Sequence, residues 1–83
     1  MPPLRKFSGK SICQLLEHHG FKLVRQKGSH LIMQKKFEKE TLTVPVPLHK
    51  DLKAGTLSSI IRQSQLARNY FEQQGRWDPP DPK

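Results

Sequence analysis

The chain has 83 residues, a formal net charge of +8 and a sequence pI near 10.1. A chain of this length forms one domain with a thin core, which excludes a deep cofactor cavity and leaves a shallow surface site. Its single cysteine, Cys13, excludes an intrachain disulfide framework, and no apolar stretch is long enough to cross a membrane. The excess of cations predicts a polyanionic partner, either a nucleic acid, an acidic protein or an anionic membrane surface.

The N-terminal part of the chain predicts a loose arm and then a helix. Residues 1–7 carry two prolines and two cations and lack the apolar run of a secretory signal, so we expect a flexible arm on a cytoplasmic protein. Ser8 is placed to cap a helix with its hydroxyl. Apolar residues follow at spacings of three and four, and Gly20 supplies a left-handed stop, which predicts a helix over residues 9–19. Cys13 falls within this apolar pattern, which favours a small core residue rather than a nucleophile.

Three strands are expected after this helix. Residues 21–27 mix apolar and cationic side chains without helical spacing, Gly28–Ser29 signals a turn, and residues 30–36 form a second strand. After a polar turn, residues 40–46 form a third strand, in which alternate apolar residues share one face. Pro45 cannot donate to a ladder, so this strand lies at an edge of the sheet or leaves the sheet there.

Alternation along the second strand divides its side chains between two faces. One face carries His30, Ile32 and Gln34, and the other carries Leu31, Met33 and Lys35. Which of the two is buried depends on where the helices pack, and alternation alone does not decide this. If Leu31 and Met33 are the buried pair, His30 lies on the open face of the sheet.

The last third of the chain predicts two more helices and a tail. Gly55 and Thr56 open a second helix, with Thr56 as its N-cap, and apolar residues at helical spacing form its inner stripe. Apolar residues between positions 66 and 71 predict a short third helix that packs back on the domain. The proline-rich residues 75–83 predict a disordered tail, so the domain is expected to span residues 8–74.

The order of these elements, helix, three strands and helix, indicates an α+β fold. Three antiparallel strands can bury one face beneath both main helices and leave the other face open. We therefore expect a three-stranded antiparallel sheet with two helices on one face, and a short extra helix near the C-terminal end.

Most conventional kinds of site find little support in the sequence. The four histidines and one cysteine show no spacing typical of a metal site, and we expect neither metal nor cofactor. His18 and His19 lie near a helix C-terminus, where residues that can carry positive charge suit the helix dipole. Gly55 and Thr56 form no phosphate-loop motif, but amides at a helix start attract phosphate, which makes them a candidate phosphate contact.

Residues 25–31 carry the groups that RNA cleavage requires. They place His30 at a strand start, beside a tight turn, with Arg25 and Lys27 just before it. A base must remove the proton of a 2′-hydroxyl, that oxygen attacks the adjacent phosphorus, and cations stabilise the added charge. Histidine acts as acid or base at neutral pH. A single histidine on a strand is often structural, however, so the residues by themselves leave both interpretations open.

A set of motifs in a fixed order resembles the HicA toxins, also called the YcfA-like family. The matching segments are SGK at residues 8–10, LL at 15–16, HGF at 19–21, RQKGSH at 25–30, TVPV at 43–46, His49, Leu52, Lys53, GTL at 55–57 and IIRQ at 60–63. The resemblance runs from about residue 7 to residue 66, which is most of the chain that is expected to be ordered.

This resemblance implies both a fold and an activity. The fold is that of a double-stranded-RNA-binding domain, which agrees with the order of elements above. The activity is that of a ribosome-independent mRNA interferase, an endoribonuclease toxin with one essential histidine, here His30. The implied partner is a HicB-type antitoxin, which blocks the histidine and neutralises the basic face.

On this hypothesis His30 is the general base or acid of metal-independent RNA cleavage, and other residues support it. The supporting residues are Arg25, Lys27 and Lys35 as phosphate contacts, Gly28 for the turn, Ser29 to orient the imidazole or donate to phosphate, and Gly55 and Thr56 at a helix start. His49 is a second candidate acid.

Two departures from the family pattern carry consequences. Many members have glycine after the second helix, whereas this chain has Ser64 and Gln65, which predicts that the helix continues. The long basic signature of true double-stranded-RNA-binding domains is also missing from that helix, which favours single-stranded mRNA as the substrate.

Three other functions stay open at this point. The chain could be a non-catalytic RNA-binding module, a protein whose basic face docks an acidic partner, or an inactive family member with an intact fold. Cleavage of RNA by the pure protein in EDTA distinguishes an enzyme from a binding module. An RNA affinity that depends on salt distinguishes either from a protein-docking surface.

Overall fold

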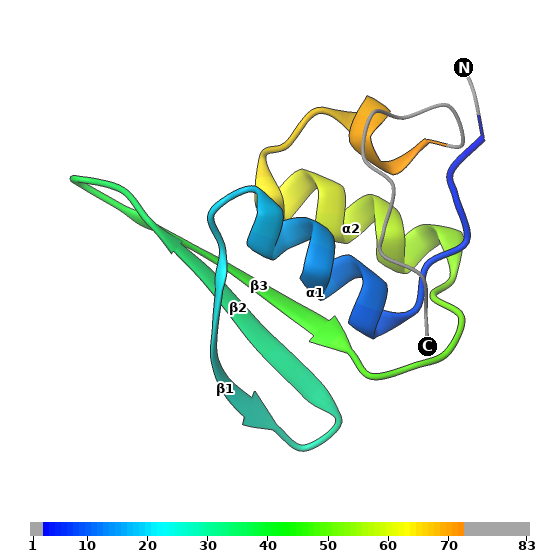
Figure 1. Cartoon of the computed structure of the whole chain (residues 1–83), viewed down its shortest axis with the longest axis horizontal. Coiled ribbons are helices and arrows are strands. Elements are labelled where there is room, and N and C mark those ends of the chain that lie inside the picture. The colour runs from blue at the N-terminus through cyan, green and yellow to red at the C-terminus, as the bar shows by residue number, and fades with distance from the viewer. Residues whose placement is uncertain (1–2, 73–83) are drawn as a thin grey trace.

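The computed structural model describes residues 3–72 of the chain. Their order is α1 (Gly9–His18), β1 (Lys22–Lys27), β2 (His30–Lys36), β3 (Thr41–Pro47), α2 (Ala54–Ser64) and a 3-10 helix, η1 (Arg68–Phe71). The strands form one antiparallel sheet in the order β1-β2-β3, and α1 and α2 lie together over one face of it (Figure 1). This confirms the predicted α+β fold of the double-stranded-RNA-binding-domain type. The predicted tail over residues 75–83 lies outside the described residues, as does the domain end at residue 74.

Side-chain and backbone groups close to each end of helix α1 define where the helix begins and ends. The Ser8 hydroxyl accepts from the Ser11 N–H at 3.0 Å, which confirms Ser8 as the N-cap. At the other end Gly20 has a φ of +97°, a left-handed conformation that turns the chain toward β1. The Lys35 ammonium donates to the His19 carbonyl at 2.8 Å and so caps the end of the helix with positive charge.

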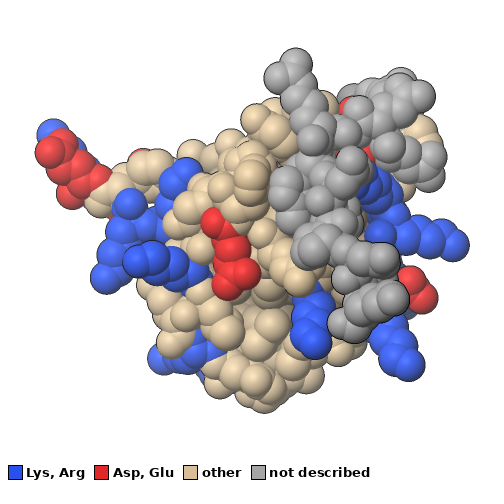
Figure 2. All heavy atoms as spheres, viewed as in Figure 1, with Lys and Arg blue, Asp and Glu red and all other residues tan. Residues whose placement is uncertain are grey.

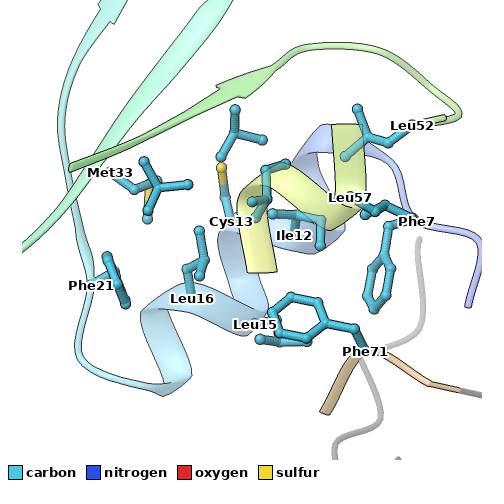
Figure 3. Close-up of a cluster of buried hydrophobic side chains, with 13 residues drawn as sticks. Phe7, Ile12, Cys13, Leu15, Leu16, Phe21, Met33, Leu52, Leu57 and Phe71 are labelled. Atoms are coloured by element: carbon cyan, nitrogen blue, oxygen red, sulfur yellow. The ribbon is translucent and has the colours of Figure 1, made fainter. Parts of the chain in front are cut away.

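The core lies between the two helices and the inner face of the sheet. The residues of this cluster are Phe7, Ile12, Cys13, Leu15, Leu16, Phe21, Met33, Val44, Val46, Leu52, Leu57, Ile60 and Phe71. Figure 3 shows most of them, with Phe21 and Met33 toward one end and Phe7 and Phe71 toward the other. Each fully buried side chain of this size contributes about 1.5–3 kcal/mol. In so thin a core, the side chains at both ends contribute substantially to the stability of the fold.

Residues 3–7 are held against the domain, whereas the sequence predicted a flexible arm. Leu4 forms an antiparallel bridge with Glu72, and the Arg5 N–H donates to the Phe71 carbonyl at 2.8 Å. Phe7 is 2% exposed, and its ring meets that of Phe71 edge-on with centroids 6.1 Å apart. The prediction rested on the local prolines and cations, and no local pattern indicates that residues 71–72 pair with this segment.

Helix α2 differs from its prediction at both ends. It begins at Ala54, so Thr56 is inside the first turn and Lys53 stands at the cap position without a side-chain bond. The helix was expected to continue, but it ends at Ser64 because the buried Ser64 hydroxyl donates to the Ile61 carbonyl and accepts from the Leu66 N–H. Gln65 then takes a φ of +59°, which turns the chain away.

No helix among residues 3–72 is long and apolar enough to span a membrane.

Candidate active site

The sheet has one face beneath the helices and one face that they leave uncovered. Leu31, Met33, Val44 and Val46 belong to the covered face, since all pack in or against the core. Alternation therefore assigns His30 to the open face. The open-face residues follow from the strand register: Lys22, Arg25 and Lys27 from β1, His30, Ile32, Gln34 and Lys36 from β2, and Thr41, Thr43, Pro45 and Pro47 from β3.

A two-residue turn joins β1 to β2 immediately before His30. Gly28 has a φ of +59°, whereas Ser29 is not among the residues with positive φ. A positive φ at the first turn position alone is the pattern of a type II′ hairpin, in which glycine is preferred there. The Ser29 carbonyl accepts from the Leu48 N–H at 2.8 Å, and the Gln26 amide donates to the Gly28 carbonyl at 3.1 Å. The turn is thus fixed from both sides.

Two cations accompany His30 on the open face. Lys27 is its direct cross-strand partner, and directly opposed residues have Cβ atoms about 4.5–5.5 Å apart. Arg25 is opposite Ile32 and therefore lies diagonal to His30, at roughly 7–8 Å. All three side chains are exposed. The imidazole and two positive groups can accordingly approach one phosphodiester from the same side.

Ile32 lies between these groups and the rest of the open face. It is 9% exposed, although it is not part of the core cluster beneath the helices. Its cross-strand neighbours are Arg25 on one side and Pro45 on the other. Ile32 therefore lies on the floor of the open face beside His30 and leaves little apolar surface of its own to a ligand.

Acidic side chains are absent from the described part of this face. No Asp or Glu occurs between Glu17 and Glu38, and Thr41 to Pro47 of β3 adds none. Figure 2 shows several Lys and Arg side chains at the end of the molecule where the strands lie, and carboxylates beside a cation at the tip of the protruding β2–β3 hairpin. Such a distribution attracts polyanions to the sheet.

Lys35 belongs to the opposite face from His30. Its ammonium donates to the His19 carbonyl and lies 5.3 Å from the centroid of the Phe37 ring. Because these contacts hold the side chain at the end of α1, we leave Lys35 out of the site, although the sequence had suggested it as a phosphate contact.

Gly55 and Thr56 are not part of the His30 cluster either. They occupy the first turn of α2, and Figure 1 shows this helix beginning away from the β1–β2 turn. His49 lies in the loop that starts at Leu48, whose N–H contacts the turn, and its carbonyl accepts from the Gly9 N–H at 2.9 Å. The loop backbone is therefore tied to both the turn and α1.

Cys13 has the buried position that the sequence predicted. It is 8% exposed, and burial, followed by the charge of Glu17, raises the pKa of its thiol to about 11. A thiol in this state is a poor nucleophile. Among residues 3–72, no three His, Cys, Asp or Glu side chains gather where they could hold a metal ion.

The sequence was compared with models of known protein families. The model of the HicA toxin of bacterial toxin–antitoxin systems matches residues 9–66. The chain belongs to the HicA toxin family. The matched segment contains α1, the whole sheet and α2, and therefore includes His30 and its neighbours. No curated protein and no solved structure matches the chain. Membership in a toxin–antitoxin family implies an antitoxin as partner of this HicA chain.

Sequence reasoning named His30, Arg25 and Lys27 but missed other residues of the same face. Lys36 shares the face by alternation along β2, a signal that was available. Lys22 shares it only because the strand register sets it opposite Gln34, across a bulge between Leu23 and Arg25. A bulge shifts the alternation by one residue, and nothing in the local sequence of β1 announces it.

Proposed function

We propose that this HicA chain is an endoribonuclease toxin that cleaves single-stranded mRNA with His30 as its catalytic residue. The observation that carries the proposal is the exposed His30 on an acid-free open face, with Lys27 directly opposite. A histidine in such a place has no structural task that the fold requires, since its side chain is outside the core.

The chemistry needs only the RNA and side chains of this face. His30 accepts the proton of a 2′-hydroxyl, and the resulting oxygen attacks the adjacent phosphorus. The bond from phosphorus to the 5′-oxygen breaks, which gives a 2′,3′-cyclic phosphate and a 5′-hydroxyl that takes up a proton. Lys27 and Arg25 stabilise the extra negative charge on the phosphoryl oxygens. No metal is assigned a role in these steps.

The proposed partner is an antitoxin of the HicB type that covers His30 and neutralises the cations beside it. Its acidic groups would face Arg25 and Lys27, which are the exposed charges nearest the histidine. Adding the antitoxin should then stop cleavage in proportion to the complex formed.

Induced expression in a bacterial host tests the proposal. Wild type should arrest growth with loss of bulk mRNA, whereas His30→Ala should not, provided that both proteins fold. With purified protein in EDTA, His30→Ala should lower the cleavage rate by about 10²–10⁴-fold, the usual contribution of a general acid or base. A 2′-deoxy nucleotide at the cleaved position should block the reaction entirely.

Other results would change the assignment. Equal activity of wild type and His30→Ala would remove His30 as the catalyst, and His49→Ala would be the next variant to assay. Folded wild-type protein that binds RNA but leaves it whole in EDTA would mean that the chain is a binding module or an inactive family member.

A further inference from the structure

The open face of the sheet has a shallow hollow at the far end of β2 from His30. Its volume is about 300 Å³, and it is lined by Gly20, Lys22, Val24, Gln34 and Lys36. That volume is at the low end for ligand sites, which range over roughly 300–1,000 Å³. The hollow can therefore hold a group about the size of one nucleotide, which is part of a longer ligand.

The lining combines positive charge with an apolar surface, both of which a nucleotide can use. Lys22 and Lys36 place ammonium groups where a phosphate can meet either of them. Val24 is 47% exposed and offers an apolar surface to the flat face of a base. Gly20 contributes its backbone to the lining.

Gln34 supplies the groups that can tell one base from another. Its Nε2 donates to the exposed Thr43 hydroxyl at 3.3 Å, which favours one orientation of the amide. One N–H of that nitrogen and both lone pairs of the amide oxygen are then available to a ligand. An amide that both donates and accepts is suited to the hydrogen-bonding edge of a base.

The hollow and His30 lie on the same face of the same strand. Gln34 follows His30 by four residues, a separation of about 13 Å at the rise of a β-strand. A few nucleotides of extended single strand span this distance, and Ile32 lies between the two points. The cations along the route have no acidic neighbour within their own strands.

We propose that this hollow binds one nucleotide of the RNA strand whose scissile phosphate lies at His30, and that Gln34 selects its base. The proposal rests on the proposed function for the choice of RNA as the ligand. It adds a second contact point, a few nucleotides from the cleaved bond, that sets substrate register and sequence preference.

Titration of the full chain with each of the four nucleoside monophosphates, followed by backbone amide NMR, tests the site without any cleavage. The largest shifts should occur at Gly20, Val24 and Gln34, and one base should bind more tightly than the others. The double change Lys22→Gln and Lys36→Gln should weaken binding at least tenfold. Lys39→Gln, which removes one charge at the exposed tip of the β2–β3 hairpin, is the matched control and should leave binding unchanged.

Gln34→Ala separates base selection from attraction to phosphate. It should remove the preference among the four bases while the amide spectrum stays that of folded protein. Inorganic phosphate alone should shift fewer residues than the nucleotides do. Equal shifts with phosphate and nucleotides, or equal weakening by Lys39→Gln, would overturn the proposal, because either would mean general attraction of anions.

The binding assay keeps the two proposals apart. If the wild type fails to cleave RNA but nucleotides still bind in the hollow, the subsite stands and the nuclease assignment fails. If RNA is cleaved at His30 while nucleotides shift only the residues of the β1–β2 turn, the subsite fails and the nuclease assignment stands.

Discussion

Among residues 3–72, Gln65 is the one residue other than glycine with a positive φ. Its φ of +59° lies in the left-handed region, where only glycine is free of a penalty. For other residues this conformation costs roughly 1–2 kcal/mol. The hydrogen bonds of Ser64 hold it there by ending α2 one residue earlier.

Gln65→Gly should therefore stabilise the protein. We expect a gain of about 0.5–1 kcal/mol, which is less than the strain relieved, because the greater entropy of glycine in the unfolded chain opposes folding. Urea unfolding followed by circular dichroism measures this. Gln63→Gly, an exposed position inside the same helix, is the matched control and should lose about 1 kcal/mol. Equal losses at both positions would show that Gln65 carries no strain.

His19 shows how burial outweighs the helix dipole. The sequence suggested that the helix dipole stabilises a protonated histidine at the end of α1. In the structure, burial lowers the pKa of His19 from its ordinary value of 6.5, and the charges of His18 and Lys35 lower it further. Its Nε2 is buried and, among the described residues, has no hydrogen-bond partner. The ring packs against Tyr70 with centroids 4.4 Å apart.

A lowered pKa makes the stability fall in acid. Below about pH 6.5, the unfolded chain binds a proton at His19 that the folded chain takes up only at lower pH. The contribution of His19 is thus full above pH 6.5 and is lost as the pH falls toward its folded pKa. His19→Phe keeps the ring against Tyr70 and removes the titration. Its urea midpoint should change less than that of wild type between pH 7.5 and 5.5, and parallel curves would contradict the assignment.

At the scale of elements, the start of α1 is pressed against the end of β3. The Gly9 N–H donates to the His49 carbonyl, and a side chain at Gly9 would overlap the Pro47 carbonyl and approach Leu48 Cα to 3.2 Å. Pro47 is also the cross-strand partner of His30. This junction therefore sets the position of the loop next to the candidate site.

Two glycine replacements separate this packing from helix propensity. Gly9→Ala should destabilise the protein by about 1–3 kcal/mol, the usual cost of overpacking. Gly55→Ala is the control, because nothing lies within 4 Å of its would-be Cβ, and it should stabilise by about 0.5 kcal/mol through propensity. Thermal or urea unfolding shows whether each variant is less or more stable than the wild type. A stabilised Gly9→Ala variant would mean that α1 and β3 are not in close contact.

The elements that could be predicted from the sequence are those specified by local chemistry. The Ser8 cap, the Gly28 turn and the alternation of Val44 and Val46 all follow from neighbours a few residues away. The contact of Phe7 with Phe71 joins residues 64 positions apart, and no local pattern contains it. The sequence could place His30 on the open face only conditionally, because that position depends on which side of the sheet the helices cover.

At the scale of the whole molecule, charge is separated between surfaces. The described carboxylates are on α1 at Glu17, on the β2–β3 hairpin at Glu38 and Glu40, in a loop at Asp51 and beside the chain end at Glu72. None belongs to the open face, whereas Lys22, Arg25, Lys27 and Lys36 do. At physiological salt the screening length is about 8 Å. An RNA strand on that face is therefore attracted mainly by these four cations rather than by the total charge.

The salt dependence of RNA binding tests this separation. With His30→Ala to prevent cleavage, the logarithm of the affinity for a single strand should fall linearly with the logarithm of salt, with a slope of roughly −0.7 for each phosphate contacted. Arg25→Gln and Lys27→Gln should each reduce the slope by about 0.7, since each removes one contact. Lys39→Gln removes the same charge from the hairpin tip and should leave the slope unchanged. If all three variants shift the slope equally, RNA responds to the net charge of the molecule, and the open face is not where it binds.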